Sequence, residues 1–105
     1  MANTVTYTGN VITIIPDGTT DYDSSTEFPY GVRLGAIKFY GSAANDVLEV
    51  THGAAAGPII SKMKDVTPSG AKDTFPNGLD CKPYIDVSDC TFNTAANIRI
   101  ILELL

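Results

Sequence analysis

The chain has 105 residues, of which 44% are hydrophobic and 18% charged, and its formal net charge is −5. This length predicts one domain spanning 1–105, and the composition is that of a globular chain rather than a disordered one. The seven basic residues are scattered, which argues against a nucleic-acid groove, because such a groove needs clustered Lys and Arg. No apolar stretch approaches the ~20 residues of a membrane span, and the first ten residues do not form a secretory signal. We therefore expect neither nucleic acid nor a membrane as a partner.

Residues 4–15 are typical of a β-hairpin. A Gly9-Asn10 pair lies between two runs rich in Val, Ile, Thr and Tyr, which predicts a two-residue turn of type II′. Pairing Thr8 with Val11 places four larger side chains on one face of the hairpin: Val5, Tyr7, Ile12 and Ile14. That face is expected to be buried, and the threonine-rich face to be wet.

Residues 16–31 are polar and acidic and contain two prolines, which predicts the longest loop of the chain. Its acidic and aromatic side chains are the candidate partner-contact residues: Asp17, Asp21, Tyr22, Asp23, Glu27 and Tyr30. The carboxylates are ligands of the kind that calcium takes, but their spacing does not match an EF-hand, so a solvated loop is favoured over a calcium site. Tyr22 and Tyr30 are also the tyrosines best placed to stack against a sugar.

The middle of the chain predicts further strands over 31–41, 46–52, 58–66 and 81–87. The apolar phase of the first of these slips at Gly35, where a β-bulge would return Ile37 and Phe39 to the side of Val32 and Leu34. Residues 67–80 are rich in Gly, Pro, Asn and Asp and are expected to form a loop, and 88–97 another turn region.

The last strand, 98–105, has the clearest pattern. Ile98, Ile100, Leu102 and Leu104 line one face without exception, which predicts a core face. The other face is half apolar, and we take it as a candidate subunit interface; its residues are Arg99, Ile101, Glu103 and Leu105. An ordinary central strand of a sandwich explains the same pattern.

Together these elements predict an all-β fold of about seven strands. The expected architecture is a single antiparallel β-sandwich or small barrel, jelly-roll-like.

No catalytic or metal-binding constellation is evident. His52 is the only histidine and the two cysteines are nine residues apart, whereas a zinc site needs three or four such ligands at short spacings. No nucleophile elbow or phosphate-binding loop is present, so no cofactor is expected and His52 is interpreted as the end of a strand beside Gly53. Cys81 and Cys90 are expected to be reduced in a chain made in the cytosol, with a disulfide between them possible if the protein matures outside the cell.

Three segments give the chain a resemblance to a known group. The sequences AANDVL (43–48), VSDC (87–90) and ANIRIILEL (96–104), within a similarity over about 31–105, resemble small virion proteins of tailed bacteriophages. The resemblance implies an all-β virion structural protein, such as a capsid decoration (cement) protein that binds the major capsid protein as a homotrimer. The first strand begins by Thr4 without a long N-terminal arm, so shell contact is expected from a sheet face or from loop 16–30.

Two other classes of function stay open. One is a head-fibre, tail or baseplate module that binds a host glycan through the loops at 16–30 and 68–80. The other is a small hydrolase, for which loss of an activity in His52→Ala would be the required observation.

Overall fold

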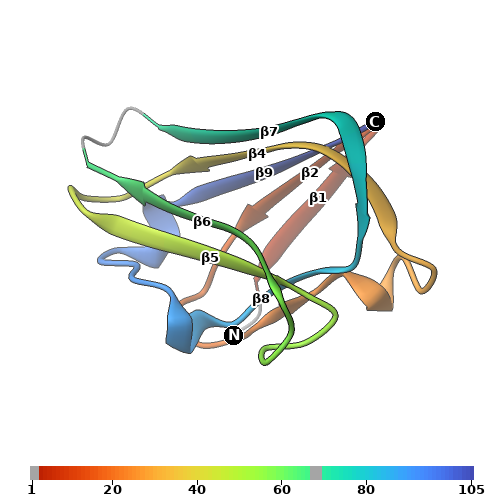
Figure 1. Cartoon of the computed structure of the whole chain (residues 1–105). Helices are drawn as coiled ribbons and strands as arrows, with labels where there is room; N and C mark the ends of the chain where they lie inside the picture. Colours follow the sequence, from red (N-terminus) through yellow and green to blue (C-terminus); the bar gives the residue numbers. More distant parts are fainter. Residues whose placement is uncertain (1–2, 67–69) are drawn as a thin grey trace.

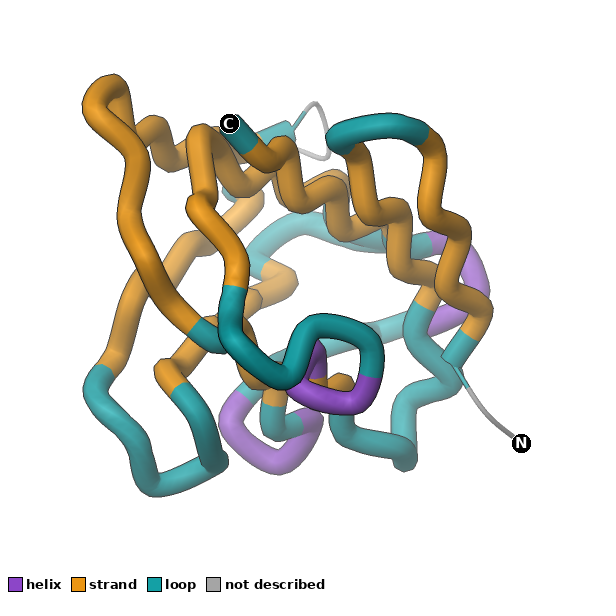
Figure 2. The backbone as a smooth tube through the Cα atoms, turned by 90° about the vertical axis from the view of Figure 1, so that its right-hand side faces the viewer, coloured by secondary structure: helices purple, strands orange, loops and turns teal. Residues whose placement is uncertain are grey.

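The computed structural model describes residues 3–66 and 70–105, and within them nine strands form two antiparallel sheets (Figure 1). The first sheet has the order β1 (Thr4–Thr8), β2 (Val11–Ile15), β9 (Arg99–Leu104), β4 (Val32–Tyr40), β7 (Ala71–Cys81). The second has the order β3 (Tyr22–Asp23), β8 (Pro83–Ile85), β5 (Asp46–His52), β6 (Ile59–Asp65). Short 3-10 turns η1 (Ser24–Thr26), η2 (Val87–Asp89) and η3 (Ala95–Asn97) lie in the loops around the two layers (Figure 2).

The strands pair as one long antiparallel hairpin that has been rolled up. β5 pairs with β6, β4 with β7, β3 with β8 and β2 with β9, each pair enclosing the one before it. Successive pairs alternate between the two sheets, and β1 extends the first sheet at its edge. This is the strand order of a jelly roll, so the predicted fold class is confirmed.

The core lies between the two sheets and is almost entirely aliphatic. The first sheet contributes Ile12, Ile14, Leu34, Ile37, Phe39, Ile100 and Leu102, and the second contributes Leu48, Val50, Met63 and Ile85. The predicted inner face of β9 is confirmed, because Ile98, Ile100 and Leu102 are completely buried. Phe92, from the loop before η3, packs on Phe39 with ring centroids 6.2 Å apart.

The predicted N-terminal hairpin is also confirmed, but its inner face is buried less than expected: Val5 is half-buried and Tyr7 is exposed, because β1 is the edge strand of the sheet. Thr8 pairs with Val11 and Val5 with Ile14, as the turn residues require. Gly9 has φ +57°, whereas Asn10 does not have a positive φ, which matches a type II′ turn. The turn therefore sets the register that buries Ile12 and Ile14.

The predicted bulge at Gly35 is confirmed. The prediction of a loop at 67–80 is wrong for the described residues from 71 on, which form strand β7. β7 pairs along β4 in two stretches, and the register shifts between Leu34 and Ala36. Opposite that shift, β7 bends and turns down toward β8 (Figure 1). Pro76 fits there because β7 is an edge strand, whose outer N–H groups need no ladder partner. Residues 67–69 lie outside the described residues.

The acidic segment at 16–31 is less irregular than expected. It contains the short strand β3, which pairs with β8, followed by η1. The count of strands rises from seven to nine because β3 and β7 were both expected to be loop. The expected turn region at 88–97 holds the end of η2 and all of η3.

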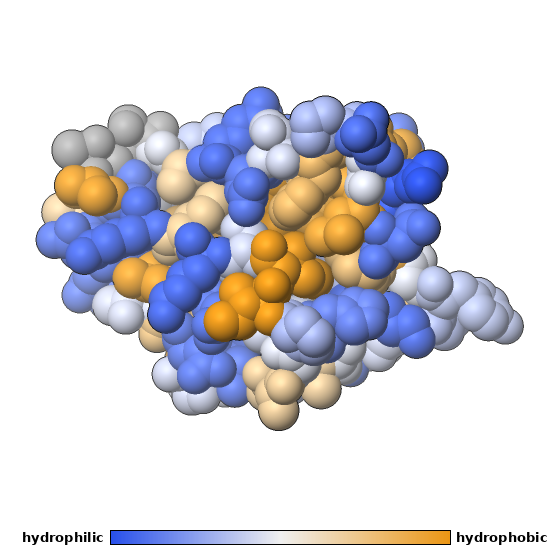
Figure 3. All heavy atoms as spheres, viewed as in Figure 1, coloured by the Kyte–Doolittle hydropathy of each residue, from blue (hydrophilic) through white to orange (hydrophobic). Residues whose placement is uncertain are grey.

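The two sheets also meet along their edge strands β6 and β7. The Ser61 hydroxyl on β6 donates to Asp73 Oδ2 on β7 at 2.7 Å, which joins the two sheets directly. Apolar side chains gather along this side of the molecule between the two strands (Figure 3); they include Ile59, Ile60, Phe75 and Leu79.

Candidate functional site

The candidate subunit interface lies at the centre of one exposed sheet face. β9 runs between β2 and β4, in the middle of the five-stranded sheet. Because strand side chains alternate, Arg99, Ile101 and Glu103 point away from the core that Ile100 and Leu102 fill. No described element lies over this face of the sheet (Figure 1).

The strand register defines what surrounds Ile101. It lies in one cross-strand row with four other residues: Thr6, Thr13, Lys38 and Lys72. Val11 and Ile15 on the same face of β2 are half-buried, and Tyr40 on β4 is partly exposed. Ile101 is therefore flanked by Thr13 and Lys38 across the strands and by Arg99 and Glu103 along β9, with threonines of β1 at one edge of the face and Lys72 at the other.

One ion pair crosses this face. Lys38 Nζ lies 2.8 Å from Glu103 Oε1, and both side chains are about one-third exposed. The hydrogen bond and charge of Glu103 raise the pKa of Lys38, and the hydrogen bond from Lys38 lowers the pKa of Glu103. An exposed pair contributes little to stability. It does, however, neutralise two of the charges that flank Ile101, while Arg99 remains as a third.

Leu105 lies on the same side of the sheet, just beyond the end of β9. Its backbone N–H donates to the Arg33 carbonyl at 2.9 Å. A Cβ placed on Gly35 would lie 3.2 Å from Leu105 Cγ, and one on Gly78 would lie 2.7 Å from Leu105 Cδ1. Leu105 thus packs over two glycines, yet it remains 63% exposed. All four predicted interface residues belong to one surface.

The carboxylates of the acidic loop mostly organise the loop itself. Asp17 accepts from the backbone N–H groups of Thr19 and Thr20, at 2.8 and 2.7 Å, and from the Thr20 hydroxyl. Hydrogen bonds from Thr20 and Thr19 lower the pKa of Asp17 to about 2. Asp23 accepts from Ser25 and caps η1.

Asp21 connects the loop to the second sheet. It accepts from the Tyr84 hydroxyl at 2.9 Å and from the Val87 N–H at 3.1 Å. The hydrogen bond to Asp21 raises the pKa of Tyr84. Asp21 therefore has a structural role, and Glu27 is left as an exposed carboxylate of this loop.

The two tyrosines of this segment differ sharply in exposure. Tyr22 is only 6% exposed and belongs to the core cluster, so it cannot present its ring to a partner. Burial raises its pKa well above the ordinary value. Tyr30 is 98% exposed at the tip of the turn that precedes β4. Of the two, only Tyr30 can stack against a ligand.

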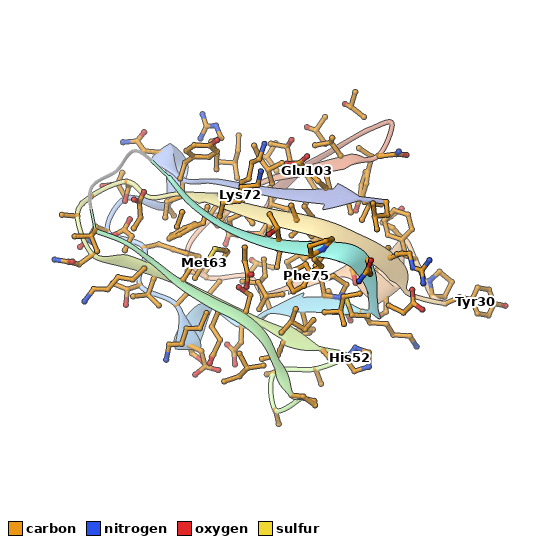
Figure 4. All side chains as sticks on the ribbon, turned by 45° about the horizontal axis from the view of Figure 1, so that its top comes forward. Tyr30, His52, Met63, Lys72, Phe75 and Glu103 are labelled. Carbon is orange, nitrogen blue, oxygen red and sulfur yellow. The ribbon has the colours of Figure 1, made fainter. Side chains whose placement is uncertain are left out.

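Tyr30 and His52 lie at the same end of the sandwich (Figure 4). They line one open pocket of about 380 Å³, together with Arg33, Asp80 and Lys82. A second pocket of about 350 Å³ shares His52 and Asp80 and continues toward Pro58, Ile59 and Leu79. As expected, His52 is the last residue of β5 and precedes Gly53.

Both cysteines are free thiols. Burial raises the pKa of Cys81 and of Cys90 to about 11, so both stay protonated and poorly nucleophilic near neutral pH. The disulfide that the sequence left open is not formed in this structure.

Two buried carboxylates were not singled out in the sequence. Asp46 and Asp65 pair across β5 and β6 and are 0% and 2% exposed. Asp46 Oδ2 accepts from the Ser42 N–H and hydroxyl, at 2.8 and 2.6 Å, and Oδ1 accepts from the Asn93 side-chain amide. Asp65 Oδ2 accepts from the Gly41 N–H at 2.9 Å. Aspartate in a strand is the signal that could have found them, because it is uncommon there.

Within 3–66 and 70–105, no three His, Cys, Asp or Glu side chains gather as a metal site. No helix in the same ranges has the length and apolar character needed to cross a membrane. Comparisons of the chain with protein-family models, with curated proteins and with solved structures give no match.

Proposed function

We propose that this chain is a virion structural protein of a tailed bacteriophage, and specifically a decoration (cement) protein of the capsid surface. In this role it acts without catalysis. It binds the major capsid protein as a homotrimer and adds buried surface to the assembled shell.

The observation that carries the proposal is the outer face of the five-stranded sheet. The face mixes apolar and polar side chains, as the surface of a non-obligate protein–protein interface does. Ile101 lies in the middle strand of the face, and Val11 and Ile15 lie diagonal to it on β2. Lys38 and Glu103 neutralise each other there, whereas Arg99 and Lys72 add positive charge to the same face.

The fold supports the proposal by analogy only. Jelly rolls are common in viral capsid proteins, and they also occur in lectins and cupins. A shared fold does not by itself assign a function. The jelly-roll strand order is thus compatible with a capsid role, whereas the exposed sheet face is specific to this chain.

In a cyclic trimer each contact is heterologous, so one surface of a subunit meets a different surface of the next. We assign the outer face around Ile101 to this contact between copies. The shell contact is then left to another surface, for which the loop at 16–30 is the candidate.

Light scattering coupled to size exclusion tests the contact between copies. The wild type is expected at about 33 kDa, three times the 11.1 kDa of one chain. Ile101→Glu places a charge at the centre of the face and should give the monomer mass. Ile59→Glu is the matched control, because Ile59 is 59% exposed on an edge strand away from this face.

A wild type that stays monomeric at high micromolar concentration would contradict the trimer. If Ile101→Glu and Ile59→Glu lose the trimer to the same extent, the assignment of the outer face around Ile101 to the contact between copies is contradicted. Circular dichroism of each variant verifies that its fold is retained.

A further inference from the structure

The open pocket beside Tyr30 brings together three segments that are distant in the sequence. Tyr30 comes from the turn before β4, and Asp80 and Lys82 come from the end of β7 and the residue after it. His52 comes from the end of β5. The pocket therefore exists only in the folded jelly roll, where these strand ends meet.

The turn that carries Tyr30 is held firmly. The Gly31 N–H donates to the Phe28 carbonyl at 2.9 Å, and Gly31 has φ +87°. Phe28 packs edge-on against Tyr7, with ring centroids 5.8 Å apart. A Cβ on Gly31 would lie only 2.8 Å from the Cys81 carbonyl oxygen, so the turn lies directly on the end of β7. The Tyr30 ring projects from a fixed base rather than from a loose loop (Figure 4).

The polar groups of the pocket have defined partners. Arg33 Nε lies 3.2 Å from Asp80 Oδ1, and both side chains are largely exposed. The Lys82 backbone N–H donates to His52 Nδ1 at 3.1 Å. Because that N–H can only donate, Nδ1 carries no proton, and the neutral His52 ring offers its Nε2–H to a ligand.

These groups match the chemistry of a sugar. The apolar C–H face of a sugar packs on the face of an exposed tyrosine ring, and the tyrosine hydroxyl stays in contact with water. Its hydroxyls can donate to the Asp80 carboxylate and accept from Arg33 or from His52. The pocket is open and polar, unlike the apolar cavities that hold drug-like ligands.

The charge of the pocket narrows the class of sugar. Arg33 and Lys82 contribute two positive charges and Asp80 one negative charge, which leaves one positive charge in excess. The whole chain carries −5, so this excess is opposite in sign to the molecule. Arg33 and Lys82 can therefore pair with a carboxylate group of the ligand.

We propose that the pocket binds an acidic saccharide, with Tyr30 stacking on the sugar ring and with Arg33 and Lys82 facing its carboxylate. This site adjoins the proposed contact between copies at Leu105, whose backbone N–H donates to the Arg33 carbonyl, but its binding chemistry does not depend on the decoration role. It would give the particle a weak affinity for acidic glycans on a surface that it meets.

Titration of the ¹⁵N-labelled full chain with trigalacturonic acid tests the proposal, using its methyl ester as the neutral counterpart. We expect saturable amide shifts at 30–33, 52 and 80–82 with the acid, and clearly weaker binding of the ester. Tricarballylate, a polycarboxylate without a sugar ring, should not bind.

Two variants with matched controls complete the test. Tyr30→Ala should weaken binding roughly 3–10-fold through loss of the aromatic contact. Lys82→Gln should weaken binding about 2–5-fold, as removal of an exposed charge does. Tyr40→Ala and Lys62→Gln remove the same side-chain types elsewhere and should leave the affinity unchanged.

No saturable shift at millimolar trigalacturonic acid would overturn the proposal, and so would shifts confined to other residues. Equal affinity for the acid and its ester would overturn the acidic class. Equal affinities for tricarballylate and for trigalacturonic acid would overturn the claim that the pocket recognises a sugar ring. None of these results bears on the trimer mass, so the decoration role is tested separately.

Discussion

Asp46 is the residue on which one end of the sandwich depends. It is fully buried at the start of β5, and it gathers the loop at 41–43 and the segment around Asn93 through hydrogen bonds to both carboxylate oxygens. A Cβ on Gly41 would lie 3.1 Å from Asp46 Cβ and 3.3 Å from Asp65 Cβ, so Gly41 packs closely between the two aspartates.

Asp46→Asn keeps the shape of the side chain but replaces one acceptor with an NH₂ donor. Donors of Ser42 or Asn93 would then lose their partner. We expect a loss of about 1–3 kcal/mol in the free energy of unfolding, the range for buried groups left unsatisfied. Urea unfolding followed by circular dichroism measures it, and a change within error would show that this cluster is not needed for stability.

The same carboxylate predicts how stability depends on pH. Burial raises the pKa of Asp46, but the hydrogen bonds from Ser42 and Asn93 outweigh burial, so its pKa lies below the ordinary value. A pKa lowered by folding contributes stability above the unfolded value of about 4, and this contribution is lost as the pH falls further. Wild type should therefore lose stability below about pH 4 more steeply than Asp46→Asn. If the free energy of unfolding depends on pH in the same way for the two proteins, the lowered pKa of Asp46 is contradicted.

At the scale of the elements, β9 is an interior strand of the first sheet, because it pairs with both β2 and β4. Ile100→Ala should cost about 2–5 kcal/mol, as large-to-small changes in a packed core do. Ile59→Ala removes the same atoms from an exposed position on β6 and should stay within about 0.5 kcal/mol. Chemical unfolding of both variants measures the difference, and similar costs would mean that the inner face is misassigned.

The turn before β4 offers a test of steric fit separate from backbone strain. Gly31 and Gly53 have φ of +87° and +80°, so alanine is strained at both. A Cβ at Gly53 would meet nothing within 4 Å, whereas one at Gly31 would meet the Cys81 carbonyl oxygen. Gly53→Ala should cost about 1–2 kcal/mol for the left-handed backbone. Gly31→Ala should add a further cost of roughly 1–3 kcal/mol for the contact. Equal thermal midpoints for the two variants would show that the turn does not pack on β7 as described.

The elements that could be predicted from the sequence are those with local signals. The Gly9-Asn10 turn, the slip at Gly35 and the alternation of β9 each lie within a few residues, and each is confirmed. β7 was missed because its Pro, Gly and Asn residues have low strand propensity, and its strand character comes from pairing with β4, which is more than thirty residues away. Tertiary pairing outweighed local propensity there.

The candidate sites also differ in whether a local sequence signal could predict them. The outward set on β9 follows from simple alternation, and the structure keeps it on one face. The pocket beside Tyr30 could not be predicted, because the jelly roll brings Tyr30, His52 and Asp80 together from three strand ends. The burial of Tyr22 was also hidden, since it depends on the pairing of β3 with β8.

At the scale of the whole molecule, the rolled hairpin separates the surfaces that the proposals use. The five-stranded sheet presents its outer face along one side, and the pocket beside Tyr30 lies at the end where β5, β7 and the turn before β4 meet. In the proposed assembly one copy contacts its neighbours through the sheet face, and the Tyr30 end lies outside that contact.

Binding to assembled shells is the measurement that tests the decoration role most directly. Shells assembled from the major capsid protein of the same phage, without decoration, are sedimented with increasing amounts of the wild-type chain. We predict saturable binding in multiples of three copies, with reduced binding of Ile101→Glu. A folded wild type that stays in the supernatant at every concentration would contradict the decoration role.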